Sequence, residues 1–212
     1  QSEHYRNDFQ PKMNEYGYDS IYIKRSGDKT EGCCLFFRKD RLKLVDRKTV
    51  PFYRQDIALL IGILTCFVLT TDLYLFFFSD NCGLIAVFQP KTRHAASDDL
   101  FCVATTHLLF SPKRGDIKLA QIQYFLAEID RLSRKHSTTN NYHPIIICGD
   151  LNAQPRSPLS RFLIDGHIKY DIYRSIEISG QIPQSIVRNR FSLQLPSSEL
   201  LPSSFVTSNC SF

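Results

Sequence analysis

An apolar run that ends in a polar turn, IIICGDLN at residues 145–152, is the strongest structural signal in this 212-residue chain. Four apolar residues in succession, three of them β-branched, indicate a short strand that is covered on both faces. Asp150 and Asn152 are poor strand residues, and they follow at the strand's end, where sheets commonly present polar groups to solvent. They offer one base and one neutral hydrogen-bonding group to the same small volume. A purely structural turn is the alternative interpretation.

A second strand of the same kind precedes it. Residues 101–108 read FCVATTHL, an apolar strand that ends in Thr-His-Leu and carries His107. A basic turn, PKRGDIK, then leads into residues 119–134, where apolar side chains recur at helical spacing. The predicted order is strand, helix, strand, with polar motifs at both strand ends. Neighbouring strand ends lie about 5 Å apart in a sheet, so we expect His107, Asp150 and Asn152 to line one cleft.

This order of motifs resembles the endonuclease/exonuclease/phosphatase superfamily, and within it the Angel proteins of the Ccr4-type branch. Four stretches carry the resemblance: EGC at 31–33, RGDIKLAQ at 114–121, CGDLN at 148–152 with the prolines and serine that follow it, and ISGQ at 178–181. The resemblance implies an α/β fold of the DNase I-like type, a two-sheet β-sandwich flanked by helices.

Three functional positions of the superfamily pattern fall outside this chain. The main metal-binding glutamate would precede residue 1 by about two positions, and Glu3 falls in the following helix, where it would face away. The closing aspartate and the histidine of the terminal SDH turn would follow residue 212. We therefore expect a fold that is incomplete at both ends and a fragment that is inactive by itself.

The resemblance implies hydrolysis of phosphoesters by water, with these residues in named roles. Asp150 is expected to orient and deprotonate the water, and Asn152 to hydrogen-bond the phosphate without adding negative charge. His107 would stabilise charge on the phosphate oxygens, although a buried structural histidine is the alternative. Glu31 would orient the His107 ring, unless it is a solvated turn residue, and Asn81 would bind substrate.

The expected cofactor is Mg²⁺ or Mn²⁺, because carboxylate, carboxamide and water are hard ligands. The resemblance implies RNA as substrate, with removal of 2′,3′-cyclic phosphate from RNA ends or shortening of poly(A) by a 3′ exonuclease activity. The sequence does not choose between these. A non-catalytic module that binds RNA or translation factors is the alternative from another class.

Composition adds weaker expectations. The net charge of +5 suits a phosphate-bearing partner without requiring one. Seven cysteines are an odd number and show no metal-binding spacing, and Cys102 and Cys148 lie inside apolar strands. We expect an intracellular, reduced protein of the cytoplasm or nucleus, and a monomer.

Residues 57–78 form an apolar block that is long enough to cross a bilayer. In the Angel pattern, however, Leu59-Leu60 joins almost directly to the stretch that starts at Asp80. Residues 61–79 are therefore interpreted as an insertion that arises from an unspliced intron or a gene-model error, and no membrane association is expected. The predicted organisation is a partial catalytic domain at 1–180, with this insertion, followed by a Ser/Pro-rich loop or disordered segment at 181–212.

Overall fold

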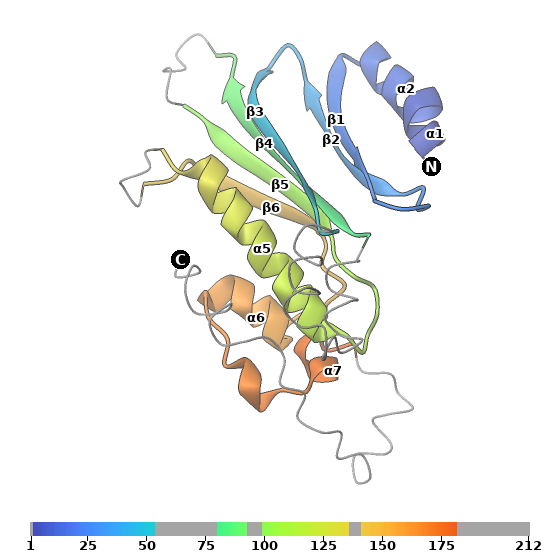
Figure 1. The fold of residues 1–212 in the computed structure, drawn as a ribbon. Coiled ribbons are helices and arrows are strands. Elements are labelled where there is room, and N and C mark those ends of the chain that lie inside the picture. The colour runs from blue at the N-terminus through green and yellow to red at the C-terminus, as the bar shows by residue number, and fades with distance from the viewer. Residues whose placement is uncertain (1, 54–79, 93–98, 136–140, 182–212) are drawn as a thin grey trace, which may run out of the picture. The chain divides into compact units, whose positions relative to one another are not determined.

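The structure is a computed structural model that describes residues 2–53, 80–92, 99–135 and 141–181 (Figure 1). Within these ranges, a strand, a helix and a strand follow one another between residues 101 and 150, as the sequence predicts. The elements are α1 (Ser2–His4), the π-helical turn η1 (Tyr5–Phe9), α2 (Gln10–Glu15), β1 (Tyr18–Lys24), β2 (Gly32–Arg38), β3 (Leu42–Pro51), β4 (Cys82–Pro90), β5 (Phe101–His107), α5 (Gly115–Ser133), β6 (Ile145–Asp150), α6 (Pro158–Asp165), the 3₁₀ turn η2 (Tyr170–Ile172) and α7 (Ser175–Ile178).

The chain divides into two compact units. The first comprises Gln1–His107 with Glu128–Gly149, and the second comprises Leu108–Ala127 with Asp150–Phe212. The boundary passes through α5 and through the end of β6.

The first unit contains two sheets. β1 pairs with β2 in antiparallel register from Tyr18 with Arg38 to Lys24 with Gly32, and the second sheet has the order β3-β4-β5-β6. A shared apolar core consists of Ile21, Cys33, Phe37, Cys82, Leu84, Ala86 and Phe88. This core draws side chains from both sheets, since the first three lie on β1 and β2 and the rest on β4. The α/β fold with two sheets and flanking helices is confirmed.

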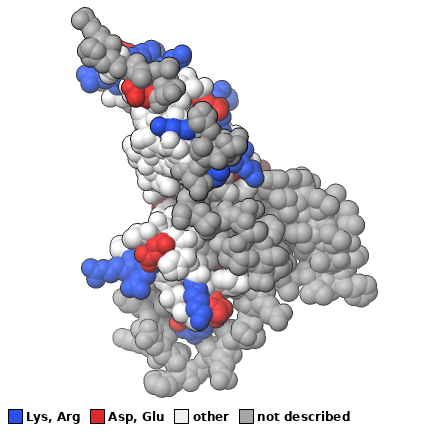
Figure 2. All heavy atoms as spheres, turned by 90° about the vertical axis from the view of Figure 1, so that its left-hand side faces the viewer, with Lys and Arg blue, Asp and Glu red and all other residues white. Residues whose placement is uncertain are grey.

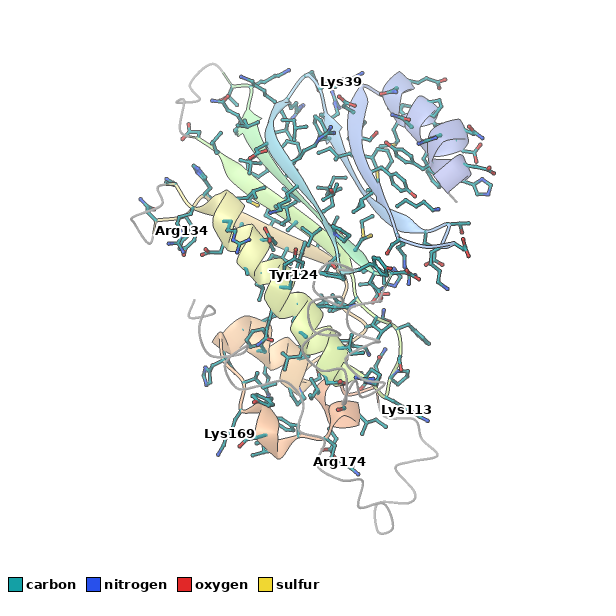
Figure 3. The ribbon with its side chains drawn as sticks, viewed as in Figure 1. Lys39, Lys113, Tyr124, Arg134, Lys169 and Arg174 are labelled. Carbon is teal, nitrogen blue, oxygen red and sulfur yellow. The ribbon has the colours of Figure 1, made fainter. Side chains whose placement is uncertain are left out.

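The last part of α5 is held within the first unit by charged side chains. The carboxylate of Glu128 is only 4% exposed and is paired with Lys48 of β3 and with Arg131, whose Nη1 lies 2.9 Å from Oε1. Arg134 follows the helix (Figure 3), where its Nη2 donates to both oxygens of Asp130 at 3.0 and 2.9 Å. A buried carboxylate needs such partners, because burial without them disfavours its charge.

β5 and β6 run in parallel. Cys102 N–H donates to the Pro144 carbonyl at 2.8 Å and Leu108 N–H donates to the Asp150 carbonyl at 2.9 Å, so both strands advance in the same direction. Parallel neighbours require a crossover connection, and α5 provides it. Within the first unit, the carboxyl ends of these strands, His107 and Gly149, therefore meet the same edge of the sheet.

The prediction that β6 is covered on both faces is wrong. All six of its residues are exposed, and Ile146 exposes 55% of its surface. The reason is its place in the sheet, because β6 is the last strand in the order that the described residues form. Cys148 is consequently exposed rather than buried, whereas Cys102, on the interior strand β5, is buried. β4, flanked by β3 and β5, is the strand buried on both faces.

The second unit contains the start of α5 and the short helices. α6 begins after Ser157, whose Oγ accepts a hydrogen bond from Ser160 N–H at 3.2 Å, and ends at Gly166 in the left-handed conformation. Both boundaries follow the usual rules for helix ends. Lys169 and Arg174 lie on either side of η2 (Figure 3).

Charged side chains of both signs are mixed over the surface. On the face drawn in Figure 2, the described Lys and Arg side chains have Asp and Glu side chains beside them. Exposed ion pairs contribute to this pattern, such as Arg38 with Asp40 at 2.7 Å. The described basic side chains are thus not gathered into one area without acidic neighbours on this face.

Several expectations fall outside the described residues. They concern the insertion at 61–79 and all but the first residue of the segment at 181–212. No helix in the described part of the chain is long and apolar enough to cross a membrane.

Candidate active site

The Gly-Asp-x-Asn motif forms a tight turn in the second unit. Asn152 N–H donates to Oδ1 of Asp150 at 2.8 Å, and Asn152 Nδ2 donates to the Leu108 carbonyl at 2.9 Å. Asn152 is 8% exposed and has a positive φ of 47°, which asparagine tolerates better than most residues. The Asp150 side chain is thereby oriented by its own turn. Asn152 ties the turn to the residue that follows His107.

Gly149 allows the backbone to enter this turn. Its φ is +127°, and a Cβ built on it would lie 2.1 Å from the Thr106 carbonyl oxygen. No other residue has room for that approach, because a real Cβ contact of this length does not occur. Within the first unit, the glycine thus brings the end of β6 directly against β5.

Lys118 contacts the backbone of this turn at Asn152. The sequence analysis did not predict a functional role for this residue. Its side chain is fully buried, and its Nζ donates to the Asn152 carbonyl at 2.9 Å, to Ser179 Oγ at 3.2 Å and to Gln181 Oε1 at 2.5 Å. Burial lowers the pKa of Lys118 to about 8, while the carboxylates of Asp150 and Asp116 oppose that shift. The ammonium thus has three oxygen acceptors and two nearby negative charges.

A signal for Lys118 was present in the sequence. Lys118, Ile122, Phe125 and Ile129 follow one another at helical spacing, so the lysine lies on the apolar stripe of α5. A lysine on such a face is almost never buried unless it is paired. The sequence could not, however, predict which residues accept the hydrogen bonds of Lys118.

His107 and Asn81 lie together in the first unit. Asn81 is 2% exposed, and its Nδ2 donates to the His107 carbonyl at 2.9 Å. The amide therefore holds the end of β5, where the histidine is placed. The predicted substrate-binding role of Asn81 is not tested by this contact and stays a prediction.

Glu31 has a different partner from the one expected. Its Oε2 accepts from Arg25 Nη1 at 2.7 Å, and its side chain is 48% exposed. Glu31 and His107 nevertheless line one cavity of about 760 Å³, together with aromatic side chains that include Tyr5, Tyr22 and Phe36. A direct hydrogen bond between Glu31 and the His107 ring stays a prediction. So does the convergence of His107 with Asp150 and Asn152, which lie in different units.

We expect Glu31→Gln to lower kcat of the full-length protein by ~10-fold, because a neutral amide stabilises a charged imidazole less than a carboxylate does. Nitrogen NMR of the His107 ring should show a changed tautomer in this variant. Asp28→Asn, an exposed acid in the same hairpin, is the matched control and should leave both unchanged. If the two variants behave alike, Glu31 does not orient the histidine.

The described residues do not by themselves fit a divalent cation. They contain no group of three or more His, Cys, Asp or Glu side chains placed to hold a metal ion. Asp150 is the carboxylate of the turn, and one of its oxygens already accepts the Asn152 N–H.

Comparison with known proteins identifies the class. The chain matches crystal structures of ANGEL2, a 2′,3′-cyclic phosphatase, with a TM-score of 0.72 and 34% identity over 87% of this chain and 46% of that one. The catalytic domain of human nocturnin shares the fold at a TM-score of 0.55 and 21% identity, over 76% of this chain and 52% of that one. The fold is thus that of the endonuclease/exonuclease/phosphatase proteins, as expected.

Within this class, the curated relatives confirm the resemblance to the Angel proteins. Protein angel homolog 2 from Bos taurus is 36% identical over 92% of this chain, and protein angel homolog 1 from Rattus norvegicus is 34% identical over 99%. The chain spans about a third of their length, at 32% and 29%. No protein-family model matches the chain.

Proposed function

We propose that the full-length protein containing this chain is a metal-dependent phosphoesterase that removes 2′,3′-cyclic phosphate from RNA ends. The observation that carries the proposal is the 34% identity to ANGEL2, a 2′,3′-cyclic phosphatase, over 87% of the chain. Proteins of this fold are generally dependent on divalent metal, which would supply charge stabilisation at the phosphate when bound.

The proposed roles follow from the chemistry of each side chain. Asp150, as a carboxylate, accepts the proton of the attacking water. His107 donates toward the phosphate oxygens as negative charge builds on them, and such contacts contribute several kcal/mol in a preorganised site. Asn152 keeps the turn in place, because its Nδ2 donates one hydrogen bond to the Leu108 carbonyl. The second N–H of the same amide group is proposed to donate to the phosphate.

The test is an assay of the full-length protein on RNA that ends in a 2′,3′-cyclic phosphate. Two water molecules should cleave the two phosphate ester bonds in turn, which releases inorganic phosphate and leaves 2′- and 3′-hydroxyls. We expect phosphate release that depends on added Mg²⁺ or Mn²⁺ and stops with a chelator. RNA of the same sequence with a 3′-hydroxyl end is the control and should not become shorter.

The same assay distinguishes the alternatives. Stepwise shortening of 3′-hydroxyl poly(A), with the cyclic end untouched, would assign a 3′ exonuclease activity instead. RNA binding without turnover of either substrate would assign a non-catalytic module.

A further inference from the structure

Three sequence motifs meet at one buried ammonium in the second unit. Lys118 comes from RGDIKL, Asn152 from the Gly-Asp-x-Asn turn, and Ser179 and Gln181 from ISGQ. The same segments are joined again by the backbone, where Gln154 N–H donates to the Ser179 carbonyl at 2.8 Å. The loop of residues 178–181 is therefore fastened to the turn of Asp150 from two sides.

The packing around the start of α5 makes this arrangement specific. A Cβ at Gly115 would lie 2.3 Å from the Ser175 carbonyl oxygen and 2.8 Å from Ile178 Cβ. Only a glycine lets α5 approach α7 this closely, and that approach brings the Lys118 side chain within reach of Ser179. Gly180, with a φ of +70°, turns the chain so that Gln181 reaches the same ammonium.

Lys118 cannot act by touching the substrate. Its side chain is fully buried, and its three donors have three oxygen acceptors within 3.2 Å. An ammonium has three N–H groups, so none is left for a phosphate. Besides the attraction between its charge and the Asp150 carboxylate, Lys118 can act through the groups that it holds. Among these groups, the Asn152 backbone is the one linked to Asp150 by a hydrogen bond.

We propose that Lys118 is a positioning residue that sets the orientation of Asp150 by fixing the Asn152 backbone to the loop of Ser179 and Gln181. The path is short. Lys118 Nζ holds the Asn152 carbonyl, and Asn152 N–H holds Oδ1 of Asp150 at 2.8 Å. The inference rests on the proposed function for its kinetic consequence, but the structural coupling stands apart from any substrate.

The experiment uses the full-length protein with Lys118→Met, which keeps the length of the side chain and removes the ammonium. We expect kcat on cyclic-phosphate RNA to fall by ~10- to 100-fold with KM nearly unchanged, since small misplacement of a reacting group has effects of this size. Amide hydrogen exchange at Asn152 should become faster at a temperature where the variant is folded. Lys169→Met, an exposed lysine of the same unit, is the matched control and should change neither quantity.

A second variant separates position from charge. Ser179→Ala with Gln181→Leu removes two of the three acceptors and leaves the Lys118 charge in place. A positioning role predicts that this double variant also lowers kcat and speeds exchange at Asn152. If Lys118→Met lowers kcat while the double variant is normal, the charge of Lys118 is what matters and the proposal is wrong.

Loss of folding and failure of the proposed function are both distinguishable from failure of this inference. Should Lys118→Met not fold, Ser179→Ala alone provides the same readouts with a smaller perturbation. Should the wild-type protein have no activity on cyclic-phosphate RNA, the proposed function fails, and hydrogen exchange at Asn152 still tests the coupling. Unchanged exchange at Asn152 in folded Lys118 and Ser179 variants overturns the inference.

Discussion

Asp150→Asn in the full-length protein is expected to lower turnover on cyclic-phosphate RNA by ~10²-fold or more, which is the usual contribution of a positioned acid–base group. The substitution is informative because it keeps the size and shape of the side chain and removes only its negative charge. An asparagine oxygen can still accept the Asn152 N–H that now lies 2.8 Å from Asp150 Oδ1, so the turn is retained. What disappears is the acceptor of the water proton.

The measurement is kcat at saturating RNA, with folding checked by circular dichroism. Asp165→Asn, an exposed carboxylate at the end of α6, is the control for the loss of one negative charge in the same unit and should leave kcat unchanged. Unchanged turnover in Asp150→Asn would remove Asp150 from the mechanism. Equal losses in the two variants would assign the effect to net charge.

The sequence predicted most strands and helices because their signals are local. The strand predicted at residues 101–108 is β5 at Phe101–His107, and the end of α6 follows from Gly166. The burial of β6 was not predictable in the same way. Three isoleucines in succession describe a strand, but the exposure of its faces depends on which elements lie beside it, and β6 is last in its sheet order.

In the candidate site, too, contacts between residues close together in the sequence were predictable, whereas contacts between residues far apart were not. The turn of Asp150 and Asn152 is built from residues two apart and was recognisable at once. The partners of Lys118 are separated from it by 34, 61 and 63 residues, so no local pattern could name them. Glu31 was expected to contact a distant partner, His107. The structure pairs Glu31 with Arg25, six residues away, and its contact with the His107 ring stays a prediction.

Gly149→Ala is expected to destabilise the full-length protein by about 3 kcal/mol or more, the range of substitutions that force backbone strain. Two effects add at this position. Gly149 has a φ of +127°, which L-residues rarely adopt, and the new Cβ would lie 2.1 Å from the Thr106 carbonyl oxygen and 2.8 Å from its nitrogen. Both contacts are to backbone, so β5 or β6 has to move.

Gly17→Ala is the control that isolates the first effect. Gly17 follows α2 with a φ of +80°, and a Cβ there meets nothing within 4 Å, so its cost should be about 1 kcal/mol. The measurement is the shift of the urea midpoint for each variant, followed by circular dichroism and by hydrogen exchange at Asn152. Because β6 leads directly into the turn, the larger shift in Gly149→Ala should come with faster exchange at Asn152 and lower kcat. Equal shifts for the two glycines would mean that the close approach of β6 to Thr106 contributes little, and that the turn of Asp150 is not held by the sheet.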